Sequence, residues 1–99
     1  MKIPGLSFGV KKYLAEYLGT LLLLTVILAS GGQFAAVGLS LAAAVYLTGS
    51  ISGGHINPAV SLAMYVNKKI SLNDLLGYVV AQLAGGVSSV YLYRAVMSM

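Results

Sequence analysis

Residues 52–66 read SGGHINPAVSLAMYV, and this stretch decides how the chain folds. A helix is expected to begin at Pro58, because Asn57 before it is a favourable N-cap and proline fits the first helical position. At 1.5 Å per residue, residues 57–66 reach about 15 Å, half the thickness of a bilayer's hydrocarbon core. The lysine pair at 68–69 complements the helix dipole and marks a return to the interface. The stretch therefore predicts a re-entrant half-helix that begins near mid-membrane and leaves on the side it entered.

The composition of the whole chain indicates that its solvent is lipid. Of the 99 residues, 59% are apolar and 8% are charged, whereas soluble domains carry about 25% charged residues. No charged residue occurs from Tyr17 to Asn67. Because the chain has no cysteine, disulfides, thiolate metal sites and cysteine catalysis are excluded, and we expect no metal, no cofactor and no enzymatic activity. The formal charge of +4 comes from six basic residues, which favours membrane flanks over a nucleic-acid partner.

Three apolar segments are long enough to cross a hydrocarbon core of about 30 Å. They cover about residues 13–30, 34–51 and 72–93. The third follows the Ser71-Leu72-Asn73-Asp74 segment, which has the Ser-x-x-acid form of a capping box. We predict an all-α membrane protein in which residues 1–99 form a single unit of three transmembrane helices plus one re-entrant half-helix, the re-entrant loop and half-helix covering about 52–66.

Irregular backbone inside a bilayer must line water or be buried in protein, because lipid offers no hydrogen-bond partners. A re-entrant loop at residues 52–56 therefore implies a water-filled path. The alternative is a short interfacial helix that lies flat on the membrane after a two-span hairpin.

The basic residues are distributed unequally over the two sides of this topology. Five of them fall on one side and a single one on the other: Lys2, Lys11, Lys12, Lys68 and Lys69 against Arg94. By the positive-inside rule we expect the N-terminus to be cytoplasmic. We expect an integral protein of the plasma or inner membrane.

The loop closely resembles the first signature loop of the major intrinsic protein family, the aquaporins and glycerol facilitators. The match runs through Ser52-Gly53-Gly54-His55-Ile56-Asn57-Pro58-Ala59-Val60. The Ala15-Glu16-Tyr17-Leu18-Gly19-Thr20 segment is similar to the family's first-helix motif, and Ala81-Gln82-Leu83-Ala84-Gly85-Gly86 to its third-helix motif. The three matches occur in the family's order and spacing, and together they cover nearly the whole chain.

The resemblance implies a fold of six helices in two inverted repeats, each of which contributes one half-helix beside a narrow pore. This chain resembles the first repeat, since Val60 stands where the second repeat usually has arginine. We therefore expect either a fragment of a longer protein or a half that assembles with another subunit. The implied function is a passive channel for water or small uncharged solutes, surrounded by membrane lipid and forming a homo-oligomer.

By resemblance, the carbonyl groups that precede Asn57 form a ladder of hydrogen-bond acceptors for the solute, and the Asn57 side chain adds an amide donor. The positive end of the half-helix would oppose cations. The predicted pore-lining residues are Gly53, Gly54, His55, Ile56, Asn57, Pro58, Ala59 and, at the outer mouth, Val37.

Val37 precedes Asn57 by 20 residues, at a place where the family often has a bulky aromatic residue. A valine there predicts a wider mouth that admits glycerol-like solutes. The alternative is that Val37 faces lipid or a neighbouring helix.

Two polar residues inside the spans are expected to anchor the loop. In the family, the glutamate of the first-helix motif holds the signature loop by hydrogen bonds, and the resemblance implies the same role for Glu16. The alternative is that the Glu16 side chain extends to the membrane interface beside Lys12, four residues earlier. Gln82 is expected to be another buried anchor, either of the loop or between helices; the alternative is a glutamine exposed to lipid. His55 without a partner carboxylate or cysteine is a poor metal ligand and is better explained as a loop-anchoring histidine.

Two other interpretations remain open. The run after Lys11 and Lys12 has features of a cleaved signal peptide, although Glu16 interrupts its start. A small non-selective or structural, holin-like membrane protein would explain the length and composition but not the signature loop.

Overall fold

The computed structural model describes residues 8–99, so Lys2, which contributes to the orientation prediction, lies outside the described residues. The described chain consists of four helices: α1 Phe8–Ser30, α2 Phe34–Ser52, α3 Pro58–Val66 and α4 Leu72–Met97. Three of them contain segments long and apolar enough to cross a membrane, at Gly9–Ser30, Phe34–Ser52 and Leu72–Met97. The predicted all-α membrane class is confirmed.

Two helices extend beyond the predicted spans. Helix α1 begins at Phe8 rather than near residue 13, and passes through Lys11 and Lys12. Lysine is a good helix former whose long side chain can carry its charge to the interface, so these charges do not end the helix. Helix α4 continues to Met97, with Arg94 in its last turn, where a cation complements the dipole.

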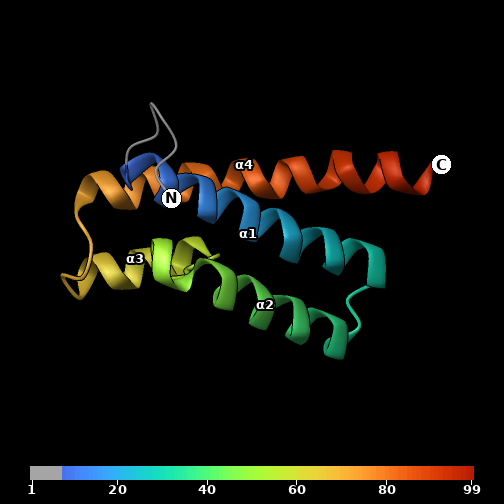
Figure 1. Cartoon of the computed structure of the whole chain (residues 1–99), viewed down its shortest axis with the longest axis horizontal. Helices are drawn as coiled ribbons and strands as arrows, with labels where there is room; N and C mark the ends of the chain where they lie inside the picture. The colour runs from blue at the N-terminus through green and yellow to red at the C-terminus, as the bar shows by residue number, and fades with distance from the viewer. Residues whose placement is uncertain (1–7) are drawn as a thin grey trace.

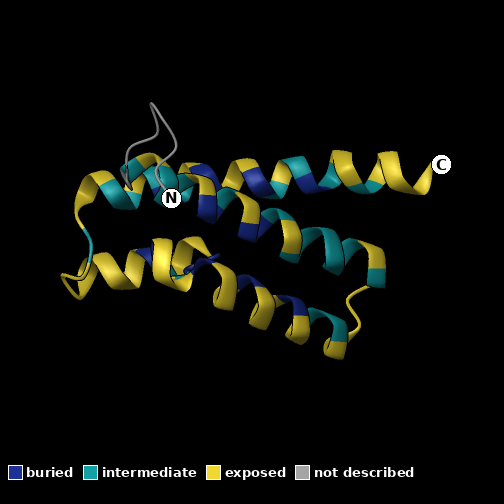
Figure 2. Cartoon of the chain, in the orientation of Figure 1, coloured by how far each residue is buried: buried dark blue, intermediate teal, exposed yellow. Residues whose placement is uncertain are grey.

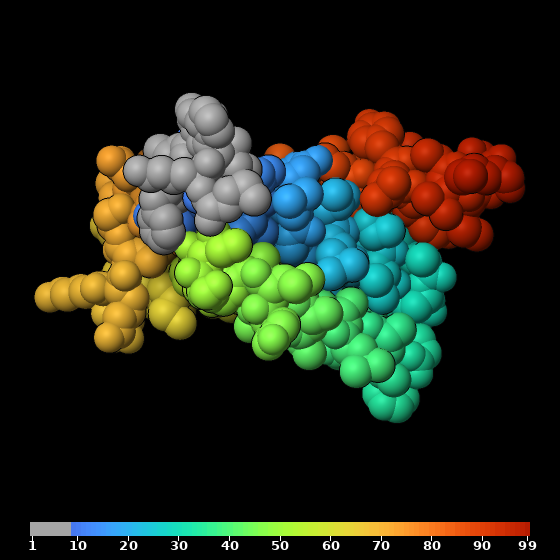
Figure 3. Space-filling model, viewed as in Figure 1, coloured from blue at the N-terminus to red at the C-terminus, as the bar shows by residue number. Residues whose placement is uncertain are grey.

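Helix α1 lies between α4 and α2 and contacts both, while α3 packs on α4 (Figure 1). The C-terminal part of α4 extends past the end of α1 (Figures 1 and 3). Small residues bring α1 and α4 close together: a Cβ placed on Gly85 would lie 2.6 Å from the carbonyl oxygen of Tyr17. Close approach at small residues is the usual way in which membrane helices pack.

The buried residues lie on the sides of α1, α2 and α4 that face one another, while the outer faces are exposed (Figure 2). Several of the buried side chains are polar, among them Glu16, Ser61 and Gln82. Large apolar side chains dominate the exposed set instead, for example Leu39 at 73% exposure and Tyr46 at 87%. An apolar exterior around a polar interior is the distribution expected of a protein surrounded by lipid or by further membrane helices.

The half-helix α3 starts partway along the length of the molecule and runs back toward the end at which α4 begins (Figure 1). Its start is built as the residue types predict: Asn57 is the N-cap, its side chain accepts from the Ala59 backbone N–H at 2.7 Å, and Pro58 takes the first position. Helix α3 ends at Val66, just before the lysine pair at 68–69.

Candidate functional site

The loop between α2 and α3 has an unusual backbone. Gly53 (φ 91°) and Gly54 (φ 66°) adopt left-handed conformations, which glycine tolerates because it has no Cβ. Ile56 has φ 58°, a rare conformation for a β-branched residue, and such a conformation costs about 1–3 kcal/mol. The loop therefore needs side chains from elsewhere in the chain to hold it.

Glu16 of α1 supplies most of these contacts. Its fully buried carboxylate accepts from the Ser52 hydroxyl at 2.6 Å and the His55 backbone N–H at 3.0 Å through Oε2. Its Oε1 accepts from the Ile56 backbone N–H and from the Gln82 side-chain amide, both at 2.8 Å. Four donors replace the water that a carboxylate loses on burial. The same contacts place the strained Ile56 and its neighbours against α1.

Gln82 connects this carboxylate to the half-helix. Its amide nitrogen also donates to the Ser61 hydroxyl at 2.9 Å, and Ser61 Oγ lies 2.8 Å from Nδ1 of His55. The His55 side chain therefore belongs to a buried polar network. A contribution of His55 to a pore would come from its backbone carbonyl.

Two members of the network are residues that sequence reasoning missed. The hydroxyl of Tyr78 donates to the Ser52 carbonyl at 2.6 Å, and its ring lies 4.8 Å from the His55 ring. Ser61 links Gln82 to His55. One signal was present: Tyr78 precedes Gln82 by four residues, which places both on one face of a helix.

The directions of the loop carbonyls follow from the N–H contacts. The described residues contain no cis peptide bond, and in a planar trans peptide the C=O points opposite to the N–H. Because the N–H groups of His55 and Ile56 point at Glu16, the carbonyls of Gly54 and His55 point away from it. The loop thus turns donors toward the interior and acceptors in the opposite direction.

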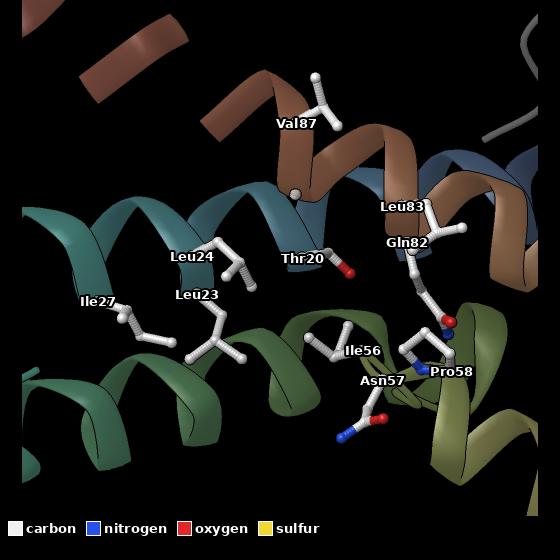
Figure 4. Close-up of a pocket in the computed structure, with 11 residues that line it drawn as sticks. Thr20, Leu23, Leu24, Ile27, Ile56, Asn57, Pro58, Gln82, Leu83 and Val87 are labelled. Atoms are coloured by element: carbon white, nitrogen blue, oxygen red, sulfur yellow. The ribbon is translucent and has the colours of Figure 1, made fainter. Parts of the chain in front are cut away.

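A cavity of about 580 Å³ lies between α1, the loop and α4 (Figure 4). Figure 4 shows Asn57 and Pro58 at its edge, Thr20 and leucines on the α1 side, and Gln82 on the α4 side. The residues that line it are Thr20, Leu23, Leu24, Ile27, Ile56, Asn57, Pro58, Gln82, Leu83, Gly86 and Val87. Its walls are apolar apart from a few side chains close to the start of the half-helix.

The predicted pore residues are divided by this geometry. Three of them line the cavity: Ile56, Asn57 and Pro58. The other five do not line this cavity: Val37, Gly53, Gly54, His55 and Ala59. Val37 lies half-buried in the first turn of α2. The pore-lining role of all eight stays a prediction.

The helix cap leaves the side-chain amide hydrogens of Asn57 available as donors. Its Oδ1 is used to cap α3, so the cap does not involve the amide hydrogens. The residue is exposed, as are Pro58 and Ala59. The positive end of α3 and an amide donor are therefore presented together at the edge of the cavity.

Comparison with known proteins gives consistent matches. The sequence model of the family described as "Major intrinsic protein" matches residues 4–99. The "Glycerol uptake facilitator protein-like 6" of Lactiplantibacillus plantarum is 45% identical over 85 residues, which cover 78% of this chain and 39% of that protein. The "Lens fiber major intrinsic protein" of Gallus gallus is 40% identical over 86 residues, covering 76% and 33%. "Aquaporin PIP2-7" of Arabidopsis thaliana is 47% identical over 53 residues, covering 54% and 19%. The chain thus spans less than half the length of these relatives.

Proposed function

Because the chain belongs to the major intrinsic protein family, we propose that it forms half the wall of a passive transmembrane channel for water or small uncharged solutes. The names of its relatives, a glycerol uptake facilitator and aquaporins, support this solute class. The proposal concerns the channel as a whole, of which this chain supplies one repeat. It assigns the chain no enzymatic role.

The orientation of the loop is the observation that carries the proposal. The N–H groups of His55 and Ile56 are held by Glu16, so that the carbonyls on the other side are left to accept from a passing solute. These acceptors lead to Asn57, where the amide and the positive end of α3 meet the cavity. A neutral molecule can exchange its water hydrogen bonds for these groups, while a cation meets an unfavourable potential.

We place a second repeat, in the same polypeptide or another subunit, across the cavity from α1 and α4. The exposure of the Asn57-Pro58-Ala59 turn supports this, because membrane-embedded polar backbone must be covered by protein or water. Homo-oligomerisation of the completed channel belongs to the same proposal.

The chain is an integral membrane protein, and we propose that its N-terminus is cytoplasmic, in a plasma or inner membrane. Lys11, Lys12 and the lysine pair at 68–69 belong to the end of the molecule where α1 begins and α3 ends, whereas Arg94 is near the end of α4 (Figure 1). The positive-inside rule then sets the orientation.

The test is water and ion flux through the channel that contains this chain with its second repeat, reconstituted in vesicles. Stopped-flow light scattering should show shrinkage faster than that of empty vesicles, without ionic current. Asn57→Asp keeps an acceptor for the cap but replaces the amide donor by a negative charge, so water flux should fall severalfold and cations should leak. Asn67→Asp adds the same charge at the other end of α3 and should change neither flux.

Shrinkage no faster than that of empty vesicles would overturn the proposed function. Ionic current through the unaltered channel would favour the non-selective, holin-like class.

A further inference from the structure

We infer that Tyr78 is a positioning residue of the loop: by holding the Ser52 carbonyl it sets where the carbonyls of residues 53–56 lie along the pore. The inference rests on the proposed channel function. It concerns a side chain that lies outside the cavity wall and acts through the backbone of the loop.

The loop needs two kinds of anchor, and Glu16 supplies only one of them. A carboxylate accepts hydrogen bonds, so Glu16 holds the N–H groups of His55 and Ile56 but cannot hold a carbonyl. The last carbonyls of a helix lack partners within it, and Ser52 is the last residue of α2. The Tyr78 hydroxyl donates to this carbonyl at 2.6 Å. Glu16 of α1 therefore binds N–H groups of the loop, while Tyr78 of α4 binds the carbonyl at which the loop begins.

The bond fixes the peptide plane from which the loop departs. The N–H of the Ser52–Gly53 peptide donates to the Gly49 carbonyl at 3.0 Å, and its C=O accepts from Tyr78. With both groups bonded, this planar unit cannot rotate without loss of a hydrogen bond. The next two residues are Gly53 and Gly54, whose backbones have more accessible conformations than any other residue type. Without the Tyr78 hydrogen bond, the Ser52–Gly53 peptide could rotate directly before the two glycines, Gly53 and Gly54.

Tyr78 is itself held firmly in place. It is 2% exposed, its ring meets His55 edge-on at 4.8 Å, and the Tyr13 ring lies edge-on at 6.0 Å. Tyr13 is fixed in turn by a 3.0 Å hydrogen bond to Asp74, one turn before Tyr78 on α4. The position of the Tyr78 ring is therefore set by its packing against two other rings and not by its hydrogen bond to Ser52 alone.

The experiment compares Tyr78→Phe with Tyr17→Phe in the completed channel. Tyr17 donates to Ser88 at 2.8 Å, so this control also removes one tyrosine hydroxyl that bonds to another element, but it joins α1 to α4 and does not touch the loop. Both variants keep their aromatic rings. Backbone hydrogen exchange of residues 52–57 should rise about tenfold in Tyr78→Phe, equivalent to about 1.4 kcal/mol, and remain unchanged in Tyr17→Phe.

The flux measurement adds a readout that general destabilisation would not move. Per folded channel, the ratio of glycerol to water permeability should change at least twofold in Tyr78→Phe and stay at the unaltered value in Tyr17→Phe. The inference would be overturned if Tyr78→Phe had the same hydrogen exchange of residues 52–57 and the same permeability ratio as the unaltered channel. It would also be overturned if Tyr78→Phe and Tyr17→Phe changed both quantities by the same amount. If the unaltered channel conducts nothing, the proposed function fails, and the exchange of residues 52–57 alone decides whether Tyr78 holds the loop.

Discussion

The Glu16 carboxylate and the Ile56 backbone N–H, 40 positions apart in sequence, are joined by a 2.8 Å hydrogen bond that holds a β-branched residue at φ 58°. A positive φ at isoleucine is unfavourable in an isolated peptide. The buried carboxylate with its four donors offsets that strain. The conformation of the loop is thus a property of the packed helices and not of residues 52–57 alone.

Replacement of Glu16 should reveal this dependence. Glu16→Leu leaves the buried N–H groups of His55 and Ile56 unpaired, at about 1–3 kcal/mol each. Glu16→Gln retains one acceptor oxygen and should be the milder change. The measurement is the free energy of unfolding in detergent. If glutamine and leucine are tolerated equally, Glu16 does not act by accepting hydrogen bonds.

Gly85→Ala should weaken the contact between α1 and α4. The added methyl would lie 2.6 Å from the Tyr17 carbonyl oxygen, a backbone atom that moves only with the helix, so we expect a loss of about 1–3 kcal/mol. Gly86→Ala is the matched control, because its added methyl would lie more than 4 Å from every atom other than those of its chain neighbours and the nearby backbone of its own helix. Unfolding midpoints of the two variants provide the comparison, and a Gly85→Ala protein as stable as Gly86→Ala would show that the helices can separate without cost.

Asp74→Asn should remove an ion pair near the membrane surface. Asp74 accepts from Lys12 at 2.8 Å, and both side chains stay partly accessible to water and salt, at 19% and 21% exposure, so the loss should be about 1 kcal/mol. Salt screens exposed charges, and the difference from the unaltered chain should shrink in 1 M salt. Unfolding at low and high salt measures this, with Lys69→Gln as an exposed-charge control. A loss that does not depend on salt would contradict an electrostatic role.

Val37→Phe tests the predicted pore mouth. If Val37 lies in the mouth, the larger ring should reduce glycerol flux more than water flux in the completed channel. Leu39→Phe places a ring at a neighbouring position that is 73% exposed and should leave the ratio unchanged. An unaltered ratio in Val37→Phe would remove this residue from the pore.

The proposed orientation predicts opposite labelling of two single cysteines, Lys69→Cys and Ser98→Cys. These positions lie near the end of α3 and at the end of α4, at opposite ends of the structure (Figure 1). A membrane-impermeant thiol reagent added to intact cells should label position 98 and not position 69. Similar labelling at both positions would rule out a single orientation.

The start of the half-helix and the all-α membrane class could be predicted from the sequence because both depend on local properties. Asn57 and Pro58 specify a helix start by their own chemistry, and the length of an apolar run measures what it can cross. The capping box was only half correct. The Ser71 hydroxyl accepts from the Asp74 N–H at 3.1 Å as predicted, but the Asp74 carboxylate binds Lys12 and Tyr13 of α1.

Only the tertiary structure decided which polar groups meet. Tyr78 reaches Ser52 across 26 positions and Gln82 reaches Glu16 across 66, distances in sequence that carry no periodic signal. Those contacts depend on how closely α1 and α4 approach, and Gly85 permits that approach. The sequence by itself therefore determined that a half-helix begins at Pro58 between membrane spans. The packing of the helices decided the backbone of Ile56 and the direction of the loop carbonyls, because unpaired buried donors must find an acceptor wherever the fold places one.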